Sequence, residues 1–210
     1  MEYEIIRKKI KNIYMRIKDG RVIVTAPYRI SQKEIERLVS EKSKWISKQL
    51  VKQEKINNNK KNTMVIVGKV YPIIEHKSNR NYIELGNDEV NIYLCNRDEK
   101  DTLIKQFYRK CAQKQYITTI KKMVEKTGLE PNSWRVRDIQ YAWGSCSSKR
   151  NITLSLNLIQ KREELIEYVV VHELCHLKHM DHSTDFWNLV GKYIPNYKEY
   201  RKELKSYDIS

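Results

Sequence analysis

The chain has 210 residues and a formal charge of +15, so it is long enough for one good-sized domain or a compact domain with a smaller companion. The charge indicates a polyanionic partner such as nucleic acid, nucleotide or phosphate, unless the many lysines only reflect AT-rich codon usage. Four cysteines without a CxxC pair, and no apolar stretch near about 20 residues, argue against a disulfide framework and a membrane anchor. We therefore expect a reduced, soluble, cytoplasmic protein.

The first residues carry a hairpin signal. Apolar and polar residues alternate over 3–9 and again over 12–18, and Asp19-Gly20 then leads into the strand-like run 21–27. An Asp-Gly pair between two alternating runs is typical of a tight β-hairpin turn.

A single helix is predicted next, over about 31–56. Ser31, with Glu34 three residues further on, forms a capping box, and apolar residues at helical spacing continue the pattern. The polar tract 57–62 that follows is the best linker candidate.

A second β-rich segment completes the predicted N-terminal lobe, which spans residues 1–96. Strands are expected over 64–74, 80–85 and 89–94, and Gly68 between apolar runs predicts a tight turn or a bulge.

A long helix is predicted to open the second domain, residues 97–210. It runs over about 98–127, and Gly128 with Pro131 beyond it is a typical helix end. The remaining elements are strands over 134–143 and 151–159 around a small-residue turn at 144–148, then helices over 163–178, about 183–193 and 196–207. Together these elements predict an α+β fold.

The most informative stretch of the chain is 172–182, which holds four of the five histidines. If 163–178 is one helix, His172 and His176 lie about 40° apart around its axis and one turn apart, so their imidazoles can converge on one cation. Glu173 projects beside them. This His-Glu-x-x-His arrangement is typical of zinc hydrolases, in which the carboxylate acts on a zinc-activated water.

A catalytic zinc usually takes three protein ligands and an open position, so a third ligand is needed. His179 is a poor candidate, because on a continuing helix it lies about 10 Å along the axis from His172. His182 is better placed if the helix ends near His179 and Asp181 turns the chain back. We therefore predict a site for Zn²⁺, or for another divalent metal, on the three histidines 172, 176 and 182, with Glu173 as the general base.

The chain resembles the YgjP-like metallopeptidase domain family in the motif WGSCSS at 143–148 and in YVVVHELCHLKHMDHSTDFW at 168–187. The runs 13–27 and 68–73 are also similar to the leading half of that family, so the resemblance covers nearly the whole chain. It implies a zincin-like C-terminal metallohydrolase domain with a β-rich N-terminal lobe, and the same ligand triad and base. One departure is Arg150, where the family often has glycine.

The resemblance implies a metallopeptidase-like hydrolase, and family descriptions also associate it with pyrophosphate hydrolysis of nucleoside triphosphates such as UTP. Trp143, Gly144 and Ser145 are candidates for substrate binding, and Arg137 offers a cation for phosphates. The alternative is that Trp143 belongs to the core and the small residues only turn a hairpin. A third hypothesis is a nucleic-acid-associated module similar to SprT-like zincins, which the charge of +15 would suit.

Overall fold

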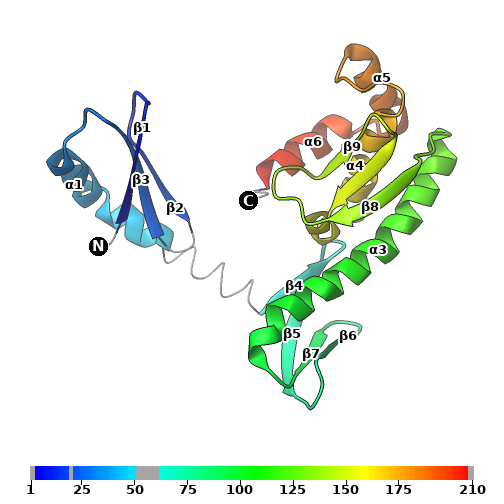
Figure 1. Cartoon of the computed structure of the whole chain (residues 1–210), viewed down its shortest axis with the longest axis horizontal. Coiled ribbons are helices and arrows are strands. Elements are labelled where there is room, and N and C mark those ends of the chain that lie inside the picture. The colour runs from blue at the N-terminus through cyan, green and yellow to red at the C-terminus, as the bar shows by residue number, and fades with distance from the viewer. Residues whose placement is uncertain (1–2, 19–20, 51–61, 208–210) are drawn as a thin grey trace. The chain divides into compact units, whose positions relative to one another are not determined.

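The computed structural model describes residues 3–18, 21–50 and 62–207 (Figure 1). The chain divides into two compact units, residues 1–62 and 63–210. Strands and helices are mixed in both units, and the expected α+β class with a β-rich N-terminal region is confirmed. Within the described ranges, no helix is long and apolar enough to cross a membrane.

A three-stranded sheet forms the core of the first unit. Its strands are β1 (Tyr3–Lys8), β2 (Tyr14–Lys18) and β3 (Arg21–Pro27), in the order β1-β3-β2. The predicted pairing of β2 with β3 is confirmed as antiparallel, and β1 joins β3 in parallel. The predicted turn at Asp19-Gly20 lies outside the described residues.

The helix of this unit covers one face of the sheet. In α1 (Gln32–Glu41), the hydroxyl of Ser31 accepts a hydrogen bond from the Glu34 amide at 3.2 Å, as the capping signal predicts. The predicted single helix is interrupted at Lys42, and residues 43–50 are helical again; the rest of it lies outside the described residues. The buried side chains that join helix and sheet are Val22, Val24, Ala26, Ile35, Val39 and Ile46.

The second unit begins with a four-stranded sheet in the order β4-β5-β7-β6. Val67 and Gly68 have φ of 49° and 78° and make the predicted tight turn between the first two strands. The strands are β4 (Thr63–Ile66), β5 (Lys69–Lys77), β6 (Tyr82–Leu85) and β7 (Val90–Leu94).

This sheet belongs to the second unit. The units therefore divide between residues 62 and 63, whereas the sequence predicted a boundary between residues 96 and 97. The reason is the apolar face of helix α3 (Lys100–Thr127), which the sheet covers. The Tyr108 hydroxyl accepts a hydrogen bond from the Val65 amide at 3.2 Å, and the Val67 amide donates to the Ile159 carbonyl at 2.7 Å. The side chains of the shared core include Met64, Ile66, Val90, Ile92, Leu94, Leu103, Ile104 and Phe107.

Helix α3 runs from this sheet to a second, three-stranded sheet (Figure 1). It follows a short 3₁₀ helix, η1 (Arg97–Glu99), and ends where predicted, because Gly128 adopts a left-handed conformation with φ of 68°. Its buried Tyr116 donates a hydrogen bond to the Ser155 carbonyl at 2.9 Å, which ties the helix to the second sheet.

The second sheet has the order β8-β10-β9 and carries the short strand that faces the candidate site. The strands are β8 (Ser133–Arg137), β9 (Gly144–Cys146) and β10 (Asn151–Ser155). The strand predicted to reach residue 159 ends earlier, since the Ser155 hydroxyl accepts from the Asn157 amide and begins a 3₁₀ helix, η2 (Leu156–Gln160). Helices α4 (Glu163–Cys175), α5 (Thr184–Tyr193) and α6 (Tyr197–Ser206) complete the unit.

Arg150 lies in the turn between β9 and β10 with a φ of 60°. This left-handed conformation favours glycine, which accounts for the glycine implied there by the family resemblance. The Arg150 guanidinium donates hydrogen bonds to the carbonyls of Leu177 (3.3 Å) and Glu130 (3.0 Å), and these contacts offset part of the conformational cost.

Candidate metal centre

Helix α4 carries the first two candidate ligands into a buried environment. Apolar side chains surround it, and Val170, Val171 and Leu174 are fully buried. His172 lies in its last turn, and His176 caps its C-terminus. The helix ends at Cys175, three residues earlier than predicted.

A tight loop returns the chain to the end of α4. The amides of Leu177 and Lys178 donate to carbonyls only three residues back, so the backbone tightens and leaves the helix axis. The Asp181 carboxylate then accepts from the Ser183 amide at 3.3 Å, and Ser183 caps α5. His182 is thereby held in the loop beside the helix end, as the sequence spacing predicts.

The three histidines converge. One nitrogen from each of His172, His176 and His182 lies within 4.8 Å of the others, and Nε2 of His172 is 3.2 Å from Nε2 of His182. Phe186 stacks on the His176 ring with centroids 4.4 Å apart, and Trp187 stacks on the His182 ring at 5.5 Å. Helix α5 therefore forms an aromatic wall that fixes the orientation of two imidazoles.

This arrangement fits a divalent metal. The Nδ1–H of His176 donates to the His179 carbonyl at 3.0 Å, which leaves Nε2 of that ring as a lone-pair donor. Two nitrogens bound to one tetrahedral zinc at about 2.05 Å lie about 3.3 Å apart, close to the 3.2 Å between His172 and His182. Burial and the neighbouring imidazoles lower the pKa of His172 to about 3, so the ring is neutral, the form that binds metal.

Glu173 lies beside the triad with its carboxylate against strand β9. It is 4% exposed, and burial raises its pKa to about 8. A Cβ atom added to Gly144 would lie 2.7 Å from Glu173 Oε1 and 2.9 Å from its Cγ, so only glycine leaves room for this side chain. Gly144 is thus a packing partner of the candidate base.

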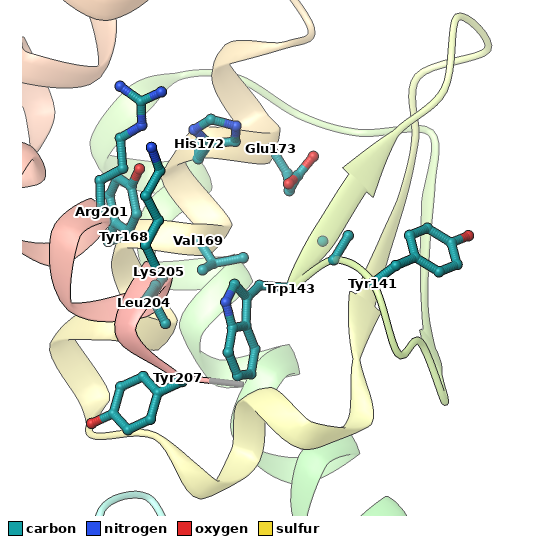
Figure 2. Close-up of a pocket in the computed structure, with 12 residues that line it drawn as sticks. Tyr141, Trp143, Tyr168, Val169, His172, Glu173, Arg201, Leu204, Lys205 and Tyr207 are labelled. Carbon is teal, nitrogen blue, oxygen red and sulfur yellow. The ribbon is translucent and has the colours of Figure 1, made fainter. Parts of the chain in front are cut away.

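A pocket of about 430 Å³ opens beside His172 and Glu173 (Figure 2). Trp143 and Gly144, predicted to contact substrate, line it, whereas Ser145 and Arg137 do not; these four assignments stay predictions. Its remaining lining residues are Tyr141, Ala142, Tyr168, Val169, Arg201, Leu204, Lys205 and Tyr207.

Tyr168 and the α6 residues that line the pocket were not predicted from the sequence. Tyr168 lies one helical turn before His172 on α4, so the spacing of four residues was a usable signal. Burial raises the pKa of Tyr168 to about 12, which keeps its hydroxyl protonated. Arg201 and Lys205 come from α6, and no local pattern distinguishes them from its solvent-facing lysines.

Helix α6 is held against the start of α4 by an ion-pair network. Arg162 donates two hydrogen bonds to the Glu203 carboxylate, at 2.7 and 3.2 Å, and also pairs with Glu164 at 2.9 Å. The Arg162 guanidinium lowers the pKa of Glu203, so the pair stays charged at neutral pH. This bidentate contact sets where the C-terminal half of α6 meets the pocket.

An α+β domain with a buried His-Glu-x-x-His helix and a third histidine defines the class of metal-dependent hydrolases. The chain matches the model of the YgjP-like metallopeptidase domain family over residues 11–207, and it belongs to this family. Membership of a metallopeptidase family implies a divalent metal and a peptide substrate.

Two solved structures are also similar to part of the chain. The metallopeptidase zymogen abylysin of Pyrococcus abyssi is 26% identical, with a TM-score of 0.40, over 42% of this chain and 90% of abylysin. The metallopeptidase zymogen jannalysin of Methanocaldococcus jannaschii is 20% identical, with a TM-score of 0.38, over 42% of this chain and 92% of jannalysin. No curated protein matches the chain.

Replacing His182 by Ala is expected to weaken zinc binding at least about 10²-fold, because one of three converging nitrogens is lost. His179→Ala is the matched control: only the backbone carbonyl of His179 contacts His176, so its affinity should stay close to that of the unmodified protein. Competition with a chromophoric chelator measures the zinc affinity of both variants. An equal loss of zinc affinity in the two variants would mean that His182 is not the third ligand.

Proposed function

We propose that the chain is a zinc-dependent peptidase in which His172, His176 and His182 hold the metal and Glu173 is the general base. The observation that carries this proposal is the convergence of three ring nitrogens within 4.8 Å directly beside a buried carboxylate, at the mouth of a pocket. Three histidine ligands leave a fourth position open, as catalytic rather than structural zinc sites do.

When bound, zinc lowers the pKa of water toward about 7 and polarises a substrate carbonyl. Glu173 takes a proton from the attacking water and delivers it to the leaving amine; burial raises the pKa of its carboxyl, which makes the carboxylate a stronger base than that of an exposed glutamate. Gly144 gives this carboxylate its space. The protonated Tyr168 hydroxyl in the pocket is a hydrogen-bond donor for the substrate carbonyl oxygen.

One edge of strand β9 is a candidate binding surface for an extended substrate. It pairs with β10 on one side, and within the described residues its other edge pairs with no strand. An edge strand can hydrogen-bond an extended peptide. Because Gly144 of this strand contacts Glu173, a peptide on that edge would bring its backbone to the base.

The test is hydrolysis of a mixed peptide library by the zinc-loaded protein, read by mass spectrometry. We expect new peptide termini, their loss after the metal is removed with a chelator, and their return when zinc is restored. A panel of nucleoside triphosphates including UTP is assayed in parallel for released phosphate and pyrophosphate. Release from the triphosphates with no peptide cleavage would replace the peptidase by the nucleotide hydrolase.

The structure gives less support to the alternative function, the hydrolysis of nucleoside triphosphates. Arg137, the cation that the sequence offered for phosphates, does not line the pocket. The peptidase is therefore the function that the site supports best.

A second candidate function is nucleic-acid binding by the first unit, and one observation favours it. Residues 1–62 contain 17 of the 41 basic and 7 of the 26 acidic side chains, so they carry +10 of the net charge of +15. Arg16 and Arg21 are exposed on the sheet face opposite α1, together with Tyr14. A basic face with an exposed aromatic ring is typical of single-strand binding.

Binding of a labelled single-stranded RNA by the full chain is expected to need no metal and to weaken steeply as salt increases. Replacing Arg16 and Arg21 by Ala should reduce both the affinity and the salt dependence, whereas removing Lys110 and Lys121, two exposed lysines of α3, should not. Fluorescence anisotropy across a salt series measures this. No binding at low salt would exclude this second function.

A further inference from the structure

Two cations of α6 line the pocket beside the candidate metal ligands. Arg201 and Lys205 are one helical turn apart, and Figure 2 shows both side chains reaching along the pocket wall toward His172. We infer that they form a subsite for the C-terminal carboxylate of a peptide, so that the enzyme removes the last residue of its substrate. This inference rests on the proposed peptidase function and names the end of the substrate that it recognises.

Neither cation has a negative partner in the described part of the chain. Glu203, on the same helix, pairs with Arg162, and no ion pair involves Arg201 or Lys205. The carboxylate in the pocket lining, that of Glu173, is buried. Like charges four residues apart on a helix repel each other, so an anion between the two side chains would relieve that repulsion.

Arg201 packs on an aromatic ring that also contacts the third candidate ligand. Its guanidinium lies over the Trp187 ring, 4.5 Å from the centroid, and Trp187 in turn stacks on the His182 ring. A guanidinium that packs on an aromatic ring can still use its N–H groups for a carboxylate, which arginine binds with two parallel hydrogen bonds. An anion held by Arg201 would therefore lie in the pocket that His172 and Glu173 also line, as the terminal carboxylate does in an exopeptidase.

The rest of the pocket suits the side chain of that terminal residue. Trp143, Val169 and Leu204 present apolar surface, and Tyr207 closes this end under a cation–π contact from Lys161 at 3.5 Å. A volume of about 430 Å³ is at the lower end of small-molecule sites, and it fits one residue with its carboxylate. We expect a preference for an apolar C-terminal residue.

The surroundings favour a carboxylate over a polyphosphate. Lys205 lies in the last turn of α6, which ends at Ser206, so the negative end of the helix dipole repels a polyphosphate with several charges more than a single carboxylate. Phosphate sites use helix N-termini and glycine-rich loops. Gly144 is the single glycine among the lining residues, and Glu173 occupies the space beside it.

The first experiment measures binding, using zinc-loaded Glu173→Gln protein so that turnover is too slow to consume the peptide. Two peptides of identical sequence, with a C-terminal Phe as the free acid or as the amide, are compared by calorimetry. We expect the acid to bind at least about 10-fold more tightly, and the added change Arg201→Ala to remove that preference. Lys202→Ala, an exposed lysine outside the pocket lining, is the matched control and should keep it. Equal binding of acid and amide would overturn the inference.

The second experiment measures cleavage by the otherwise unmodified enzyme. The acid should lose its terminal Phe with a kcat/KM about 10- to 100-fold above that for the amide, and Lys205→Ala should bring the two rates together. Cleavage of both peptides at internal bonds at equal rates would overturn the carboxylate subsite while upholding the peptidase. Selective binding without cleavage of any peptide would contradict the proposed function and uphold the subsite. UTP binding that Arg201→Ala abolishes, with no preference between the peptides, would assign the subsite to phosphate and overturn the inference.

Discussion

Glu173→Gln is expected to lower kcat for peptide hydrolysis about 10³-fold while the zinc content stays at one ion per chain. The amide has nearly the same shape as the carboxylic acid, so it fits beside Gly144, but it cannot take a proton from water. Its effect should appear in kcat rather than in KM, since the proposed general base acts on the reacting atoms. Steady-state kinetics with a fluorogenic peptide and metal analysis of the same preparation measure both quantities.

The control for this prediction is Glu163→Gln on the same helix. Glu163 is exposed in the first turn of α4, at the opposite end of the helix from His172, and its loss should leave kcat close to that of the unmodified enzyme. Activity retained by Glu173→Gln with zinc bound would show that another group accepts the proton.

The convergence of the three histidines could be predicted from the sequence because they lie within eleven residues. The spacing of His172 and His176 on a helix is fixed by helix geometry, whatever the rest of the fold does. For His182 the prediction needed only that the chain turn back. The helix ends earlier than expected, at Cys175, yet the turn near Asp181 still brings His182 to 3.2 Å from His172.

The pocket wall formed by α6 could not be predicted in the same way. Arg201, Lys202 and Lys205 are all cations within one short helix, and the sequence does not show which of them face the site. Their placement depends on the pair between Arg162 and Glu203, residues 41 positions apart. Such long-range contacts leave no periodic signal in the sequence.

The organisation of the chain was predictable only where local rules decide it. The polar tract 57–62 lies at the observed division between the units, and Gly128 ends α3 as predicted. Whether the strands 63–94 belong to the first or second unit depends on which apolar surface they cover. That surface is the face of α3 around Phe107, and the strand pattern alone is equally compatible with either unit.

Gly144→Ala is expected to reduce kcat by at least about 10²-fold, a large effect for the addition of one methyl group. The new Cβ would lie 2.7 Å from Glu173 Oε1 and 3.0 Å from Cδ, inside contact distance, so the carboxylate must move away from the site. The three atoms nearest to the new Cβ all belong to Glu173 and none to a histidine, so zinc affinity should be retained. Ser145→Ala, an exposed change in the same strand, should have little effect on kcat.

A double-variant cycle separates displacement of Glu173 from general damage to strand β9. In the enzyme with Glu173, Gly144→Ala should lower the free energy of unfolding by about 1–3 kcal/mol, as overpacking does. In a Glu173→Ala background the same change should cost close to nothing, because the atoms that it would meet are gone. Urea denaturation at one fixed zinc concentration measures the free energy of unfolding of all four proteins. An equal loss of stability in both backgrounds would mean that Gly144 is required by the strand itself, and the kcat effect would then report a distorted sheet rather than a displaced base.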